Sequence, residues 1–331
     1  MTTTEGMKGS GYYDEHSEYQ RSVAATGVSL IERCVATLPM PAPDLAVVIV
    51  DYGASTGANS LASVRAAVGA VRGRNAQQPV AAVHNDLPTN DWNQLFANLA
   101  SRPDSYAHLD GPPVLPMASA ISFFQPAVPP ASAHLGMSFS AAHWLRHQPS
   151  VTVPEGFYFC EAKGAARSGL AAQADADWTA FLIARAADLA PAGRLLVQMV
   201  GSEEPESGGE PHVTARKLLR GMAEVARDLV VAGKLDAGAV DRYVLAVYAR
   251  TPTEARAPLE RSGSQVADAF EVDTIRTDPV ANHLFEPGVT PGNDPKQVLD
   301  DYFARLTARF TADPEADAFE DWTLTVMLTR R

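Results

Sequence analysis

The chain of 331 residues is 46% hydrophobic and 20% charged, which is enough for a complete core in one large domain. Its net charge of −12 at pH 7 argues against binding to nucleic acids or anionic membranes, because both require a basic surface. The two cysteines, Cys34 and Cys160, exclude a disulfide framework and a zinc site, so we predict two small buried side chains and no metal. No signal pattern begins the chain and no apolar run approaches the roughly 20 residues that span a bilayer, so we expect a soluble cytoplasmic protein.

The first predicted element is a long helix from about Ser17 to Leu38, where apolar residues recur at helical spacing. Ser17 and Gln20 share one face of its first turn because they are three residues apart. Composition alone favours the alternatives, a helix cap for Ser17 and a solvated surface residue for Gln20. Prolines at positions 39, 41 and 43 end the helix and lead into the first strand.

The stretch around which the chain is organised begins with the apolar run Ala46–Val50. Such a run, rich in Val and without polar alternation, is typical of a strand buried on both faces of a parallel sheet. Asp51 follows, and Gly53 and Gly57 then allow a tight turn and a close approach of the backbone to a ligand. Strand, glycine turn and helix together predict the corner of an open α/β sheet at which nucleotide cofactors bind.

The glycine turn leads into a second predicted helix, which runs to about Arg72 and whose start Ser55 or Thr56 can cap. The Gly-x-x-x-Gly spacing differs from the G-x-G-x-x-G dinucleotide fingerprint. An ordinary strand-to-helix turn is therefore the alternative to a cofactor site at this point of the chain.

A second strand is predicted at Val80–Val83, and it is followed by His84, Asn85 and Asp86. An acidic residue at the end of this strand, beside the glycine turn of the first, is well placed to accept hydrogen bonds from two ribose hydroxyls. Asp86 thus favours a nucleoside-derived cofactor. The alternative is that Asp86 caps the next helix, which is predicted from about Asn90.

The second half of the chain continues the α/β pattern. Residues 101–133 are rich in proline and predict a loop, in which Phe123 and Phe124 could sandwich a flat ring. The other predicted elements are a strand at Ala133–Phe139, a helix at Gln173–Leu189, a strand at Arg194–Val200, a loop at 201–211, a helix at Val213–Ala232, a polar helical insert to about Thr277 and a closing strand at the end of the chain.

Six segments carry short motifs that can be compared with known families. They are Tyr13–Gln20 (Y-x-x-H-S-x-x-Q), Val50–Ser60 (V-D-Y-G-A-S-T-G-A-N-S), Asn85–Asn93 (N-D-L-P-T-N-D-W-N), Ser122–Ser132 (S-F-F with a later P and S), Ser138–Leu145 (S-F-S-A-A-H-W-L) and the helix Gln173–Arg185. Together they resemble the SABATH methyltransferases, which use S-adenosylmethionine to methylate carboxyl groups of small acids and ring nitrogens of xanthines. The match at Asn85–Asn93, combined with the segment around Trp144, is highly specific.

This resemblance implies the class I methyltransferase fold, a Rossmann-like, mostly parallel seven-stranded sheet with a helical cap over the active site. It implies one methyltransferase domain over residues 1–331, with cap elements from about 1–38, 101–130 and 205–290. The cofactor would be S-adenosyl-L-methionine, with S-adenosyl-L-homocysteine as product. A homodimer is a further expectation from the family.

The resemblance also implies roles for individual residues. Cofactor-binding residues would be Asp86 at the ribose, Leu87, Ser122 and Phe123 around the adenine, Ser17, Asp51, Gly53 and Asn59 at the methionine end, and Ser138 and Phe139 at the end of the strand at 133–139. Gln20 and Trp144 would grip the substrate carboxylate and are the expected catalytic residues. Tyr13 and His143 would line the substrate pocket, although a hydrogen-bonded core histidine is the alternative for His143.

The implied reaction forms the methyl ester of a small aromatic, indolic or similar apolar carboxylic acid. A carboxylate is already ionised near pH 7, so we assign no general base. Two alternatives are an N-methyltransferase of a purine-like heterocycle and a non-catalytic homologue that senses a ligand. Gln20 favours esterification, because the carboxyl-methylating branch of the family carries Gln there, and Asp51, Asp86 and Trp144 argue against the sensor.

Overall fold

The computed structural model describes residues 27–58, 60–153, 162–204, 212–213, 216–281 and 320–331. Five residues singled out from the sequence lie outside the described residues: Tyr13, Ser17, Gln20, Asn59 and Cys160.

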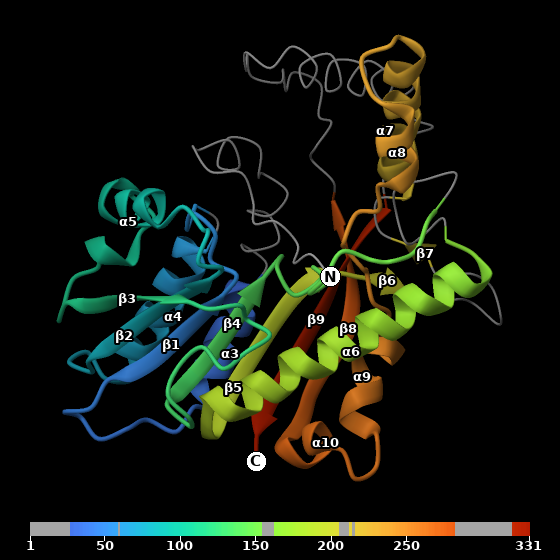
Figure 1. Ribbon diagram of the computed structural model, residues 1–331. Coiled ribbons are helices and arrows are strands. Elements are labelled where there is room, and N and C mark those ends of the chain that lie inside the picture. Colours follow the sequence, from blue (N-terminus) through green and yellow to red (C-terminus); the bar gives the residue numbers. More distant parts are fainter. Residues whose placement is uncertain (1–26, 59, 154–161, 205–211, 214–215, 282–319) are drawn as a thin grey trace.

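Seven strands form one sheet, whose order is β3-β2-β1-β4-β5-β9-β8 (Figure 1). The strands in that order are β3 (Val114–Ala120), β2 (Val80–Asp86), β1 (Val47–Tyr52), β4 (Ala133–Phe139), β5 (Leu189–Val200), β9 (Glu320–Arg330) and β8 (Phe270–Ala281). The first five pair in parallel, and β9 and β8 are antiparallel to their neighbours. The expected mostly parallel seven-stranded sheet is confirmed.

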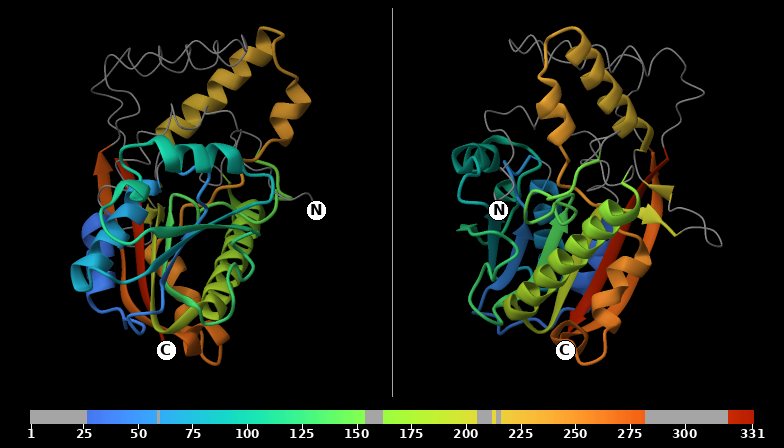
Figure 2. Two further views of the ribbon diagram at one scale, coloured as in Figure 1. Left: turned by 90° about the vertical axis from the view of Figure 1, so that its left-hand side faces the viewer. Right: turned by 45° about the vertical axis from the view of Figure 1, so that its right-hand side comes forward.

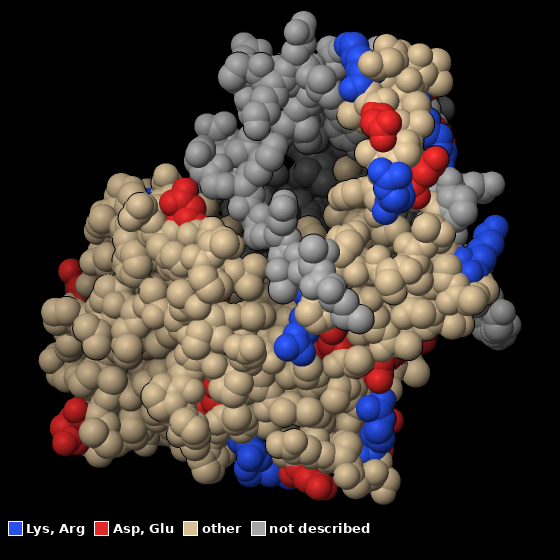
Figure 3. All heavy atoms as spheres, viewed as in Figure 1, with Lys and Arg blue, Asp and Glu red and all other residues tan. Residues whose placement is uncertain are grey.

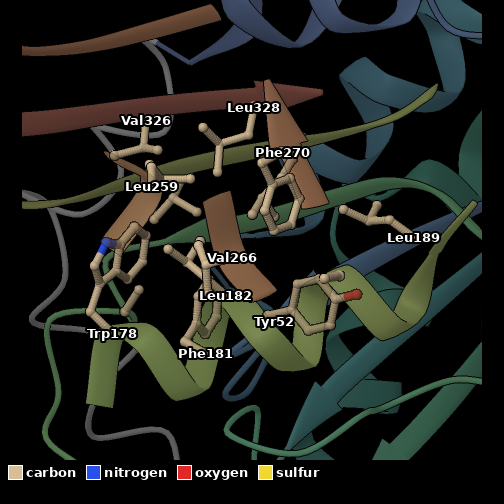
Figure 4. Packing of buried hydrophobic residues seen from close by; sticks show 14 of the residues in the cluster. Tyr52, Trp178, Phe181, Leu182, Leu189, Leu259, Val266, Phe270, Val326 and Leu328 are labelled. Carbon is tan, nitrogen blue, oxygen red and sulfur yellow. The ribbon is translucent and has the colours of Figure 1, made fainter. Parts of the chain in front are cut away.

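Helices cover both faces of the sheet, as the unbroken apolar runs of the central strands require (Figure 2). One face is covered by α3 (Val28–Ala36) and α4 (Leu61–Arg74), and the other by α6 (Gly164–Asp188), α9 (Pro252–Glu260) and α10 (Gln265–Ala269). Each face therefore has its own apolar core. On the α6 side, Trp178, Phe181 and Leu182 pack against Val326 and Leu328 of β9 (Figure 4).

The remaining helices lie toward the carboxyl ends of the parallel strands. They are α5 (Trp92–Ser101), α7 (Arg216–Val231) and α8 (Ala237–Arg242). The 3-10 turn η1 (Tyr106–His108) packs on the α4 face, where Tyr106 belongs to the same apolar cluster as residues of α4. Ala223 and Ala226 of α7 share a buried cluster with Leu170 and Ala174 from the first half of α6. Two short strands, β6 (Ser202–Glu203) and β7 (His212–Val213), pair beside this region. Helices α7 and α8 thus stand beyond the sheet where a cap is expected (Figure 1).

Two strands lie where the sequence predicted a loop and a helical insert. β3 occupies part of the supposed loop at 101–133, and its Pro116 is tolerated because β3 is an edge strand whose outer side needs no hydrogen-bond donor. β8 begins at Phe270, within the supposed insert. A register shift between Val272 and Thr274 interrupts the apolar alternation that would have identified it as a strand.

Two helix starts also differ from the prediction. α4 begins after Ser60, and neither Ser55 nor Thr56 caps it, because the glycine turn continues through a left-handed Ser55 at φ 48°. α6 begins at Gly164, well before the predicted start at Gln173, and its extra turns bury Leu170 against α7.

No described helix is both long enough and apolar enough to cross a membrane. Cys34 is buried, and burial raises the pKa of its thiol to about 12, which agrees with the predicted inert apolar role. On the described part of the face shown in Figure 3, basic and acidic side chains are scattered and form no extended patch of one sign.

Candidate cofactor and substrate site

The polar residues predicted from three different segments meet where the parallel strands end. Tyr52 at the end of β1 is in register with Asn85 of β2, and Asn85 is in register with Ser119 of β3. On the other side, Asp51 is in register with Met137 of β4. Because all four strands run in the same direction, the residues after them share one edge, where ligands of open α/β sheets bind.

The glycine turn after β1 is the centre of this edge. The N–H groups of Gly53 and Ala54 both donate to the Asn85 carbonyl, at 2.9 and 3.0 Å. Gly53 has φ +87°, and a Cβ added to it would lie 2.3 Å from Cβ of Ala141 and 3.8 Å from Cε1 of Phe123. Gly53 is therefore required both by its backbone conformation and by the closeness of the segment after β4.

Asp86 is held by the turn and is not a helix cap. Its Oδ2 accepts from the Ser55 N–H and its Oδ1 from the Leu87 N–H, both at 2.7 Å. Burial raises the pKa of this carboxyl above its usual range, and the two N–H bonds act against that rise. Helix α5 is capped instead by Asp91, which accepts from the Gln94 N–H at 3.0 Å, so the capping alternative for Asp86 is excluded.

Asp51 is buried and lies next to a histidine to which the sequence assigned no role. Nδ1 of His84 is 3.4 Å from Oδ2 of Asp51, and its Nε2 is 3.0 Å from the Tyr106 hydroxyl. The rings of His84 and Tyr106 are stacked with centroids 5.8 Å apart. Asp51, His84 and Tyr106 thus form a buried hydrogen-bonded row that fixes one oxygen of the Asp51 carboxylate.

Asn85 ties the loop that carries Ser122 and Phe123 to the same edge. Its Nδ2 donates to the Ser119 carbonyl at 2.9 Å and to the Ile121 carbonyl at 2.6 Å. The half-buried Phe123 ring then lies 4.7 Å from the ring of Phe124. Ser122 and Leu87 are also half-buried, so the residues expected around an adenine lie at the surface of one region.

At the end of β4, the two expected cofactor residues are placed differently. Ser138 is fully buried, and its hydroxyl donates to the Tyr52 carbonyl at 2.9 Å. In this arrangement Ser138 fixes the end of β1. Phe139 is half-buried and packs against the apolar cluster beneath α3 and α4.

The segment after β4 brings Trp144 close to the glycine turn. The backbone N–H of Trp144 donates to the carbonyl of Ala141, the residue that touches Gly53, at 3.0 Å. The Trp144 side chain is half-buried, and its ring lies 5.9 Å from that of His143.

His143 is buried, with 7% of its surface exposed, and Nδ1 accepts from the Val200 N–H at 3.4 Å. Burial, with Arg250 nearby, lowers the pKa of His143 to about 3, so the ring is neutral. Because Nδ1 is the acceptor, the proton of the neutral ring is on Nε2. This geometry matches the core-histidine alternative, and a direct contact of His143 with substrate stays a prediction.

Sequence reasoning missed His84, Tyr106 and the anchoring role of Asn85. Asn85 stands in the specific motif Asn85–Asn93, so its importance was visible although its partners were not. The pairing of His84 with Asp51 depends on the register of β1 against β2, which no single segment reveals.

A seven-stranded sheet of order β3-β2-β1-β4-β5-β9-β8, in which β9 alone runs opposite to the other strands, defines the class I methyltransferase fold. The chain belongs to the SAM-dependent carboxyl methyltransferase family, whose model matches residues 1–287. The SABATH resemblance is thereby confirmed, and the protein is an enzyme that transfers a methyl group from S-adenosylmethionine to a carboxyl oxygen.

The relatives by sequence include an acid methyltransferase and a probable caffeine synthase. The chain is 24% identical over 302 residues to jasmonate O-methyltransferase from Arabidopsis thaliana, covering 81% of this chain and 76% of that protein. It is 27% identical over 288 residues to a probable caffeine synthase 4 from Camellia sinensis, covering 81% and 78%. The solved structure of loganic acid methyltransferase with SAH shares the fold, with a TM-score of 0.77 and 20% identity over 99% of this chain and 98% of that one.

Proposed function

We propose that this enzyme esterifies a small, apolar carboxylic acid, such as an aromatic or indolic acid, and that Trp144 orients the acid. The observation that carries the proposal is the contact between Ala141 and Gly53, because the segment that contains Trp144 thereby lies directly beside the glycine turn. Jasmonate O-methyltransferase, a relative by sequence, acts on an acid of this general kind.

The cofactor residues present fit S-adenosylmethionine. A carboxylate has about four lone-pair positions, and the two oxygens of Asp86 each accept one backbone N–H. Two positions are thus left for the ribose hydroxyls, and Asp86 is half-buried, so a ligand can reach it. Phe123, Ser122 and Leu87 would surround the adenine, and Asp51 and Gly53 would hold the methionine end, together with Ser17 and Asn59.

Uncharged donors suit the acid better than a cation would. The Trp144 indole N–H is donor-only, and the amide of Gln20 offers an N–H₂ group. Two neutral donors can hold a carboxylate without withdrawing as much charge from it as a bidentate Arg would. The His143 ring beside Trp144 is itself neutral.

The protein then has to position the carboxylate oxygen of the acid, and no proton transfer is needed. S-adenosylmethionine, when bound, supplies a sulfonium methyl group that a carboxylate oxygen takes up as the carbon–sulfur bond breaks and its electron pair returns to sulfur. The acid is already ionised, and the products are a methyl ester and a neutral thioether. Holding the oxygen in line can supply roughly 7–11 kcal/mol, so Trp144 and Gln20 would act by orientation.

Methylation of a purine-like nitrogen is the second candidate, since a probable caffeine synthase is also a relative. A ring N–H must lose its proton for that reaction. His143, a titratable group whose ring lies beside that of Trp144, is a poor proton acceptor because its pKa is lowered and Nδ1 already accepts from Val200. The geometry at Trp144 therefore favours a substrate that arrives ionised.

A panel of aromatic, indolic, terpenoid and short aliphatic acids, with xanthines as the contrasting class, tests this proposal with isotopically labelled cofactor. We expect turnover with at least one apolar acid. Turnover of xanthines alone would replace the proposal by N-methylation. Retained cofactor binding without any methylated product would favour a sensor.

Trp144→Phe tests the orienting role, because it keeps an aromatic ring and removes the N–H. Losing a hydrogen bond to a charged group should raise KM for the acid about tenfold. Gln20→Glu should have a larger effect, because it places a like charge beside the carboxylate. Cofactor affinity should change little in both variants, and unchanged kinetics with the acid in both would remove the assignment.

A further inference from the structure

A buried ion pair closes the last turn of α6. Nη2 of Arg185 lies 2.7 Å from Oδ2 of Asp188, and both side chains are fully buried. Burying two charges is costly unless their other donors and acceptors also find partners. The partners of this pair all come from the segments that build the cofactor site.

One arm of the pair holds the loop that carries Phe123. Arg185 donates to the Phe123 carbonyl at 2.6 Å and to the Gln125 carbonyl at 2.9 Å. Asp188 accepts from the N–H of Ala127 at 3.0 Å. A guanidinium is a rigid planar fork, so two carbonyls bound to it are fixed relative to each other as well as to α6.

The other arm holds the end of β1. The Tyr52 hydroxyl donates to Oδ2 of Asp188 at 3.0 Å, and burial raises the pKa of this phenol, so it stays a donor. The Arg185 guanidinium lies 3.7 Å from the centre of the Tyr52 ring. On β4, a Cβ at Gly136 would come within 2.9 Å of this ring, so Gly136 makes room for it.

Figure 4 shows the Tyr52 side chain lying alongside α6, beside Phe181. Tyr52 stands between Asp51 and Gly53 in the chain. Its ring therefore fixes the part of β1 from which the glycine turn starts.

We propose that Arg185 and Asp188 are a positioning pair that sets the glycine turn after β1 and the Phe123 loop at a fixed separation. The inference rests on the proposed cofactor site, in which these two segments hold opposite ends of one ligand. The hydrogen bonds of both charged groups go to each other and to Tyr52, the Phe123 and Gln125 carbonyls and the Ala127 N–H. The pair acts through the groups that it holds. A cofactor that bridges the glycine turn and the Phe123 loop requires these two segments to keep a fixed distance and orientation.

Two variants separate the two arms. Tyr52→Phe removes the hydroxyl that anchors the turn and keeps the ring. Arg185→Lys keeps a charge beside Asp188 and loses the fork that binds the Phe123 and Gln125 carbonyls. The matched control is Tyr248→Phe, which also removes a buried hydroxyl bonded to a carboxylate, that of Glu254 at 2.6 Å, but from the cluster below α7.

Calorimetric titration with S-adenosylhomocysteine and with adenosine gives the readout. We expect Tyr52→Phe to weaken the binding of S-adenosylhomocysteine about tenfold, as the loss of a hydrogen bond to a charged group implies. The binding of adenosine should weaken less, because the glycine turn lies at the methionine end. Arg185→Lys should weaken the binding of both ligands by the same factor, because the Phe123 loop lies at the adenine end and both ligands contain the adenine. Tyr248→Phe should leave both dissociation constants unchanged even if it lowers the melting temperature.

Equal dissociation constants in wild type and Tyr52→Phe would overturn the positioning role, as would losses that follow melting temperature across all three variants. If Arg185→Lys does not fold, Tyr52→Phe and its control still decide. A wild-type protein that binds no S-adenosylhomocysteine would instead contradict the proposed cofactor site itself.

Discussion

At the scale of single residues, Gly53 is a position at which both the backbone conformation and the packing exclude a side chain. Its φ of +87° disfavours any side chain, and an added Cβ would collide with Ala141 at 2.3 Å. Gly53→Ala should push the glycine turn away from the segment that carries Trp144. We expect the dissociation constant for S-adenosylhomocysteine to rise about tenfold or more, given the strain of a left-handed Ala.

The matched control for this change is Gly69→Ala in α4, where an added Cβ meets nothing within 4 Å. That variant should bind the cofactor normally. Its free energy of unfolding should be about 0.5–1 kcal/mol higher, because Ala replaces Gly within a helix. Normal cofactor affinity in Gly53→Ala would contradict the close packing of the glycine turn against Ala141.

His143 is one residue through which pH should act on stability. Its pKa is lowered to about 3 in the folded protein, from a usual value of 6.5. Below pH 6.5 the unfolded chain takes up a proton that the folded chain does not, so stability falls as the pH drops toward 3. This group alone should remove up to about 1.4 kcal/mol per pH unit in that range.

Denaturant titrations at pH 7.5 and pH 5 can isolate this effect by including His143→Asn. The Asn side chain keeps an acceptor for the Val200 N–H and does not titrate. The variant should lose less stability between the two pH values than the wild type. An identical loss in both proteins would show that His143 is not buried in its neutral form.

At the scale of elements, two aspartates near the start of α5 should have separable roles. Asp91 caps the helix, and its replacement by Ala should cost about 1 kcal/mol of stability. Asp86 accepts from the turn and is proposed to bind the ribose, so Asp86→Ala should weaken S-adenosylhomocysteine binding, and the loss of its two backbone hydrogen bonds should lower stability as well. Chemical denaturation and calorimetry on both variants test this division. Loss of cofactor affinity in Asp91→Ala alone would reverse it.

The same elements show how far the fold and the site could be predicted from the sequence. β1 and the first half of β2 were predictable because strands buried on both faces are read as unbroken apolar runs, and Gly53 and Asp86 could be placed because they lie just beyond these runs. β3 could not be placed, because an exposed edge strand with Pro116 lacks that pattern. The contacts of Arg185 with Phe123 and of His84 with Asp51 depend on packing between distant segments, which spacing along the chain does not encode.

At the scale of the whole molecule, the sheet gathers the ends of β1, β2, β3 and β4 into one edge. Helix α6 links two of these ends, that of β1 through Tyr52 and that of β3 through the Phe123 loop. A ligand that binds there should stabilise the fold as a unit. With S-adenosylhomocysteine at a hundred times its dissociation constant, the free energy of unfolding should rise by about 2.7 kcal/mol. Thermal unfolding with and without the ligand measures this, and an unchanged melting temperature would contradict a preformed site.

Chemical identification of the product tests the central claim most directly. The enzyme is incubated with cofactor carrying a deuterated methyl group and with the best acid of the panel, and the product is treated with mild alkali before mass spectrometry. We predict a product whose label is released as deuterated methanol while the free acid is recovered, because the new bond is an ester. A label that survives alkali, on nitrogen or carbon, would contradict methylation at the carboxyl group.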